Sequence, residues 1–219
     1  MKTLTKQEER KQIKNSIVQN IQEVSGGQWI YSVIHYGNYG NDGLKKDWET
    51  MRWMYNKNHM VSSVHPYLKR LLREHFKIKY LYFTLERHQS SLERIEEGPN
   101  LQYGDEKKGK YHTNILISPI SDDLIRTPHS KLSRLFNELP SRSYGENLVD
   151  LKIDLINSCI RKCPWVNRYT PSVKTQVLNS IKDLTRVGHY SLKDITSKGL
   201  DFMDVLDPYN SDTKHKGRE

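Results

Sequence analysis

A strand-like run from Lys110 to Ser118 constrains the fold of this chain more than any other segment. Successive side chains of a β-strand point to opposite faces of a sheet. His112, Asn114 and Leu116 therefore share one face of the run, while its other face is mostly apolar. We expect a strand inside a sheet that begins with an imidazole and a carboxamide on the same face, two groups that suit a divalent cation.

The composition favours a nucleic acid as the partner. The chain has 219 residues, enough for one large domain, and its 35 Lys and Arg against 26 Asp and Glu give a net charge of +9. A basic surface attracts polyanions, and the 13 Tyr and 4 Trp residues supply rings that stack on bases. A generally basic protein without such a partner is the alternative. No apolar run has the length of a membrane span and no signal peptide is evident, so we expect a cytoplasmic protein with no membrane partner.

Hydrophobic periodicity predicts both strands and helices. The expected strands are 28–36, 78–87 and 111–118, and the expected helices are 5–24, 44–57, 63–76, 130–139, 148–163, 173–184 and 190–198. The polar stretch 88–109 links the second and third strands, which we expect to pair antiparallel. The predicted fold class is α+β, with a central antiparallel sheet flanked by several helices. We expect an N-terminal helical extension (1–27), a main domain (28–207) and a polar basic tail (208–219) that is mobile.

Glu86 lies near the end of the second expected strand. If the second and third strands are neighbours, its carboxylate lies beside His112 and Asn114. A carboxylate, an imidazole and an amide oxygen suit Mg²⁺ or Mn²⁺, with positions left for water and phosphate. The alternatives are a His112 that hydrogen-bonds the backbone and a Glu86 that is a surface carboxylate.

Tyr190 and Lys193 are three residues apart in the expected helix 190–198, so they share one helix face. A tyrosine can attack a DNA phosphodiester when a nearby cation lowers the pKa of its phenol or when the phosphate is activated. Lys193 could supply that charge, and His189 and Lys198 are further candidates for phosphate contacts. The alternative is a tyrosine packed at the edge of the core beside a solvated lysine.

Three segments resemble the motifs of the HUH endonuclease superfamily, in particular the single-tyrosine rolling-circle replication initiators (Rep proteins). Residues 29–36 (WIYSVIHY) resemble the first motif, a hydrophobic strand. Residues 111–117 (YHTNILI) resemble the second motif, His-hydrophobic-His, with Asn114 in place of the second His and Thr113 in place of the usual apolar residue. Residues 190–198 (YSLKDITSK) resemble the third motif, Tyr-x-x-Lys.

The resemblance implies an RRM-like core of about five strands, with 28–207 as the endonuclease domain. Glu86 stands where viral members complete the metal site, so the ion would be held by Glu86, His112 and Asn114. Tyr190, aided by Lys193, would attack single-stranded DNA and leave a 5′-phosphotyrosine and a free 3′-hydroxyl, which primes rolling-circle replication of a plasmid or virus and later rejoins the strand. The partners would be DNA at an origin or hairpin and a separate helicase, because the chain has no Walker-type motif.

Basic residues are candidates for contacts with the DNA backbone. They are Lys69, Arg70, Arg73, Lys107, Lys108, Lys110 and Lys198. One rival hypothesis is a transposase or relaxase with the same chemistry. Another is a non-catalytic, RRM-like nucleic-acid-binding protein that stacks bases on strand aromatics. These aromatics would be Trp29, Tyr31, Tyr80 and Tyr82.

Overall fold

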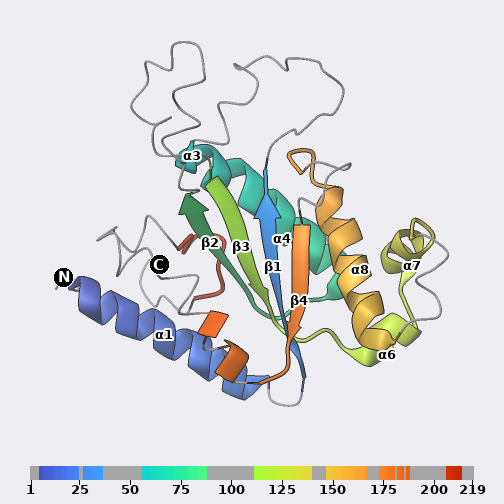
Figure 1. Cartoon of the computed structure of the whole chain (residues 1–219), viewed down its shortest axis with the longest axis horizontal. Helices are drawn as coiled ribbons and strands as arrows, with labels where there is room; N and C mark the ends of the chain where they lie inside the picture. The colour runs from blue at the N-terminus through green and yellow to red at the C-terminus, as the bar shows by residue number, and fades with distance from the viewer. Residues whose placement is uncertain are drawn as a thin grey trace, which may run out of the picture.

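A four-stranded antiparallel sheet forms the centre of the molecule, as the computed structural model shows (Figure 1). The structure describes residues 5–24, 27–36, 56–87, 111–139, 147–166, 173–180, 182–184, 186–187 and 206–213. The strands are β1 (Trp29–His35), β2 (Leu81–Arg87), β3 (Tyr111–Ile117) and β4 (Val173–Leu178), in the order β2-β3-β1-β4. The predicted α+β class, with an antiparallel sheet flanked by helices, is confirmed.

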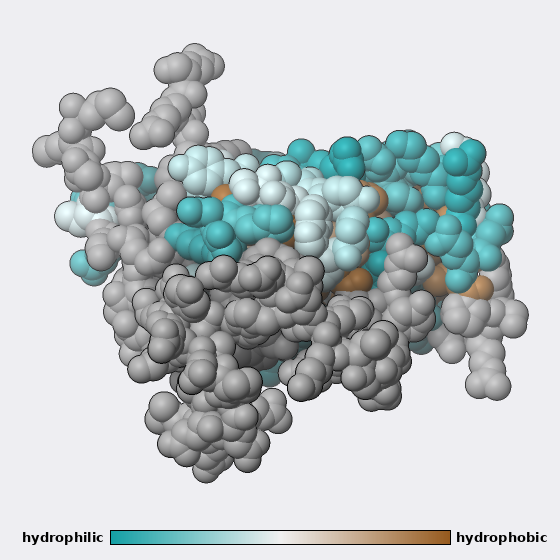
Figure 2. All heavy atoms as spheres, turned by 90° about the horizontal axis from the view of Figure 1, so that it is seen from above, coloured by the Kyte–Doolittle hydropathy of each residue, from teal (hydrophilic) through white to brown (hydrophobic). Residues whose placement is uncertain are grey.

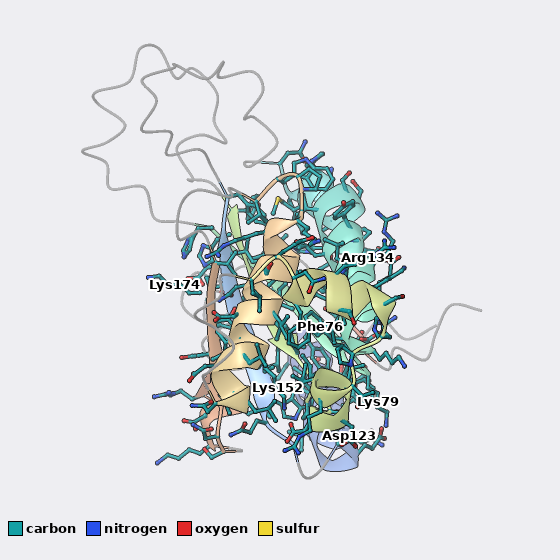
Figure 3. All side chains as sticks on the ribbon, turned by 90° about the vertical axis from the view of Figure 1, so that its right-hand side faces the viewer. Phe76, Lys79, Asp123, Arg134, Lys152 and Lys174 are labelled. Carbon is teal, nitrogen blue, oxygen red and sulfur yellow. The ribbon has the colours of Figure 1, made fainter. Side chains whose placement is uncertain are left out.

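Most of the described helical elements, but not the first, cover one face of this sheet (Figure 1). The helical elements are α1 (Lys6–Glu23), α3 (Lys57–His59), the π-helical turn η2 (Met60–Val64), α4 (His65–Phe76), α6 (Asp122–Arg126), α7 (Ser130–Phe136) and α8 (Leu148–Arg161). Side chains of α4, α7 and α8 form the main core with the inward side chains of β1, β2 and β3. In Figure 3, Phe76 lies inside this helical layer, whereas Lys174 on β4 points away from it. None of the helices in the described ranges is long and apolar enough to cross a membrane.

Helix α4 shows how the sequence produces this layer. Pro66 lies in its first turn, where the missing N–H costs no helical hydrogen bond. Leu68 and Leu72, four residues apart, are fully buried against the sheet. The helix ends at Lys77, whose left-handed backbone (φ 50°, ψ 39°) lets its N–H bond the carbonyl of Arg73.

Helix α1 packs near the end of the sheet where β1 and β2 begin, on the face opposite α4 and α8 (Figure 1). Its Ile17 contacts a second, smaller core that includes Trp29, Tyr31 and Tyr82. Its buried Asn20 donates hydrogen bonds to the Tyr82 hydroxyl and to the carbonyl of Asp212. The predicted helix 5–24 is therefore confirmed, and it covers strand aromatics.

The prediction of a helix over 173–184 is wrong, because residues 173–178 form the strand β4. Val173, Thr175 and Val177 alternate with polar residues, which is a period of two, and β-branched residues favour strands. The strand pairs antiparallel with β1, with Val33 opposite Lys174. Residues 182–184 are helical, so the error lies in the first half of the predicted segment.

The C-terminal segment 206–213 runs along the free edge of β2. Leu206 forms a bridge with Thr84, and the N–H groups of Asp207 and Asp212 bond the carbonyls of Phe83 and Leu81. The expectation of a mobile tail is wrong for residues 208–213, which are packed in place, and residues 214–219 lie outside the described residues. Such a segment covers the unpaired backbone groups of an edge strand.

Asp207 is the anchor of this segment. It is fully buried, and its carboxylate accepts hydrogen bonds from His65 Nδ1 (2.6 Å), from Asn210 Nδ2 (2.6 Å) and from the N–H groups of Tyr209 and Asn210 (3.1 Å each). Burial alone would raise the pKa of Asp207, but the hydrogen bonds from His65 and Asn210 outweigh it and lower this pKa. The carboxylate is therefore ionised in the folded protein at neutral pH.

We expect Asp207→Ala to lower the free energy of unfolding at pH 7 by about 3–5 kcal/mol, because it leaves several buried donors without their acceptor. Urea denaturation of both proteins measures this difference. Asp123→Ala, which removes an exposed carboxylate from α6, should cost less than about 1 kcal/mol. Because the folded-state pKa of Asp207 is lowered, its stabilisation is complete above the unfolded pKa of about 3.9 and is lost as the pH falls through the folded pKa. The difference between wild type and Asp207→Ala should therefore shrink below about pH 4; a constant difference would contradict this account.

Candidate metal centre

Pairing of β2 with β3 brings together the three predicted metal ligands. Glu86 is the direct cross-strand partner of His112, and Thr84 is the partner of Asn114. His112 Nε2 lies 3.0 Å from Glu86 Oε2, and Asn114 Nδ2 lies 3.5 Å from the same oxygen. The predicted face of the third strand is confirmed, because His112 and Asn114 lie with Leu116 on the face opposite Ile115 and Ile117.

The three side chains are buried and hydrogen-bonded. Glu86 is 9%, His112 7% and Asn114 2% exposed. The carbonyl oxygen of Asn114 accepts a hydrogen bond from the Tyr31 hydroxyl on β1 (2.9 Å), which orients its NH₂ group towards Glu86. The alternative of Glu86 as a surface carboxylate is therefore excluded.

Two of the three side chains already have the spacing that an ion needs. Two neighbouring ligands of an octahedral ion, each about 2.1 Å from it, lie about 3.0 Å apart, which is the separation of the Glu86 and His112 donor atoms. Rotation of the Asn114 amide would turn its oxygen towards Glu86, and the Tyr31 hydroxyl could then accept from the NH₂ group. Within the described ranges no three His, Cys, Asp or Glu side chains gather to hold a metal, so an amide would be the third protein ligand. The donor set fits a hard divalent ion such as Mg²⁺ or Mn²⁺.

The structure adds two residues that sequence analysis did not place here. His35 is the partner of His112 across β1 and β3, with ring centroids 5.3 Å apart, so two imidazoles and a carboxylate form a row across three strands. Lys174 lies opposite Val33, which also pairs with Asn114, so this exposed lysine is on the same face. The alternation of the first strand could have indicated His35. Lys174 was missed because its strand was predicted as a helix.

The centre lies where the chain leaves the described part of the structure, after residues 36 and 87 and before residue 111. Tyr190, Lys193 and Lys198 lie outside the described residues, as do Lys107, Lys108 and Lys110.

Seen from above, the described surface is mainly hydrophilic, with only small apolar patches (Figure 2).

The basic residues predicted on α4 lie on the helical side of the sheet, away from the face of the centre. Two of them hold the C-terminal segment, since Arg73 (2.6 Å) and Lys69 (3.5 Å) contact the carboxylate of Asp212. Arg70 lies over the ring of Tyr67, 4.9 Å from its centroid. These side chains therefore take part in ion pairs and ring contacts of the fold, on the side of the sheet opposite the centre.

The strand aromatics proposed as a base-stacking platform are covered. Trp29, Tyr31 and Tyr82 are buried in the small core under α1, and the Tyr80 hydroxyl bonds Glu23 of this helix. Base stacking needs open ring faces. The arrangement disfavours an RRM-like binder that uses these four rings.

Comparisons with protein-family models, with curated proteins and with solved structures find no match to this chain.

Proposed function

We propose that this protein is a metal-dependent endonuclease that nicks and rejoins single-stranded DNA, with Tyr190 as the nucleophile, and that it initiates rolling-circle replication. The observation that carries the proposal is the convergence of Glu86, His112 and Asn114. These residues come from two strands that are separated by an excursion of more than twenty residues, yet their side chains meet on one face. Buried acidic and imidazole groups that meet in this way are candidates for a functional site.

The residues have distinct roles in the proposed reaction. Glu86, His112 and Asn114 would hold Mg²⁺ or Mn²⁺, and a bound ion would supply electrostatic stabilisation of the charge that develops on the scissile phosphate. The Tyr190 oxygen attacks phosphorus, the bond from phosphorus to the 3′ oxygen breaks, and the phenolic proton is lost while the released 3′ oxygen gains a proton. Lys193 lies one helical turn from Tyr190 in the predicted helix and favours the phenolate. Attack by a 3′-hydroxyl on the 5′-phosphotyrosine reverses these steps and needs no other energy source.

The substrate would be a single strand at an origin or hairpin, with a separate helicase to open the duplex. The net charge of +9 favours a polyanion, and Lys174 is a described cation on the face of the centre. We propose Lys174 as a contact with the DNA backbone in place of the α4 residues.

Covalent trapping tests the proposal. The protein is incubated with a randomised pool of single-stranded DNA in Mn²⁺ or in EDTA, and the products are separated on a denaturing gel. We expect a shifted protein–DNA band in Mn²⁺ alone, and sequencing of the trapped DNA then gives the nick site. Tight binding without any covalent band, in Mn²⁺ or Mg²⁺, would instead indicate a non-catalytic binding protein.

Tyr31→Phe tests the orientation of Asn114. The Tyr31 hydroxyl lies 2.9 Å from the Asn114 amide and can accept from its NH₂ group once the amide is rotated to present its oxygen to an ion. Loss of the hydroxyl removes this partner of the rotated amide, so we expect Mn²⁺ affinity to fall about tenfold. Calorimetric titration measures this affinity. Tyr82→Phe is the matched control, because Tyr82 is buried on the same face but bonds Asn20 of α1. Equal effects of the two variants would argue against a specific role of Tyr31.

A further inference from the structure

Thr113 is a polar residue in the apolar face of β3. It lies between His112 and Asn114 in the chain, and its side chain points to the opposite face, towards the helices. Its neighbours on that face, Ile115 and Ile117, are fully buried. Thr113 is also fully buried, so its hydroxyl needs partners inside the core.

Two side chains bond this hydroxyl. Tyr36, next to His35 at the end of β1, donates from its hydroxyl to Thr113 Oγ1 (2.9 Å). Burial raises the pKa of Tyr36 far above its usual value, so it remains a donor. His65 Nε2 lies 2.9 Å from the same oxygen, and the Thr113 hydrogen is left for it.

His65 is itself held from three sides. Its Nδ1 lies 2.6 Å from Asp207 Oδ2, and its ring stacks on Phe83 with centroids 4.9 Å apart. Asn210 donates to Asp207 (2.6 Å) and to the carbonyl of Val61 in η2 (2.8 Å), so α4, the π turn and the C-terminal segment are joined at this point. The result is a continuous hydrogen-bonded chain from Tyr36 through Thr113 and His65 to Asp207.

An acid, a histidine and a hydroxyl in this order are also the parts of a nucleophilic triad. Here Thr113, His65 and Asp207 are all completely buried, so a substrate has no access to the hydroxyl. The hydrogen-bonded chain therefore serves to hold parts of the protein in position and not to attack a substrate. Its end point is the residue between the two predicted metal ligands of β3.

We propose that Asp207 and His65, through Thr113, position His112 and Asn114 from behind the sheet. Hydrogen bonds at Thr113 fix the backbone of β3 near its first residue, where the described part of the chain resumes at residue 111. The bond from Tyr36 fixes the end of β1 in the same way, beside His35. The relevance of this positioning to catalysis rests on the proposed function. The positioning of His112 and Asn114 through Thr113 does not depend on it.

Three variants separate positioning from packing. Thr113→Val removes the hydroxyl and keeps the branched shape, Thr113→Ser keeps the hydroxyl, and Ile115→Val makes a small cavity two residues along on the same buried face. The first readout is the ¹H–¹⁵N spectrum of the His112 ring, assigned with His112→Gln. The second is Mn²⁺ affinity by titration.

We expect Thr113→Val to shift the His112 ring signals and to weaken Mn²⁺ binding about tenfold. Thr113→Ser should retain both properties, and Ile115→Val should change neither. Unchanged His112 signals in Thr113→Val, or an equal shift in Ile115→Val, would overturn the proposal. If wild-type protein binds no Mn²⁺, the proposed function fails, while the ring signals still decide whether the hydrogen-bonded chain positions His112.

Discussion

Tyr190→Phe is expected to abolish the covalent protein–DNA product. Phenylalanine keeps the ring and removes the oxygen that forms the bond to phosphorus, so no 5′-phosphotyrosine can form at this position. DNA binding should persist, because the backbone contacts and the three predicted metal ligands are unchanged. Denaturing gels of reactions in Mn²⁺ measure the covalent product, and a filter-binding assay measures retained affinity.

Tyr209→Phe is the matched control for this experiment. Tyr209 is 73% exposed in the C-terminal segment, so it is the described tyrosine most accessible to DNA by chance. We expect it to form the wild-type amount of product. A covalent band that survives Tyr190→Phe and disappears in Tyr209→Phe would keep the chemistry but move the nucleophile to the C-terminal segment.

Much of the centre could be predicted because it follows from residue patterns within two short, consecutive strands. Strict alternation in 111–117 assigns His112 and Asn114 to one face, and the same period assigns Glu86 to a face of its strand. Pairing of two consecutive strands is the most common arrangement, so their proximity needed no long-range information. The predicted α+β sheet follows from the same local patterns.

The rest could not be predicted because it depends on distant segments. The hydrogen bonds of His65 join residues that are 48 and 142 positions apart, and no periodic pattern relates His65, Thr113 and Asp207. The strand β4 pairs with β1 across more than a hundred residues, and a short run with one partly exposed face has a weak signal. The polar composition of 208–213 predicted a tail, but its polar groups bond the edge of β2.

His112→Ala should remove most of the metal-dependent cleavage. An ion that stabilises charge in the transition state contributes several kcal/mol, so its loss corresponds to a decrease of about 10³-fold in the rate of strand cleavage. His112 supplies the one imidazole in the predicted donor set, and its Nε2 lies 3.0 Å from Glu86 Oε2, so alanine removes one of the three predicted donors. Mn²⁺ affinity should fall with the rate.

The control for His112→Ala is the same substitution at His129. His129 precedes α7 on the helical side of the sheet and contacts the carbonyl of His75 (2.9 Å), so it tests the loss of an imidazole away from the centre. Single-turnover cleavage of a labelled oligonucleotide, repeated over a range of Mn²⁺ concentrations, separates weaker binding from a slower reaction. If His112→Ala cleaves at the wild-type rate at every Mn²⁺ concentration, the centre built from Glu86, His112 and Asn114 is not the site of the reaction. If cleavage recovers at high Mn²⁺, His112 acts mainly in holding the ion, with Glu86 and Asn114 sufficient to place it.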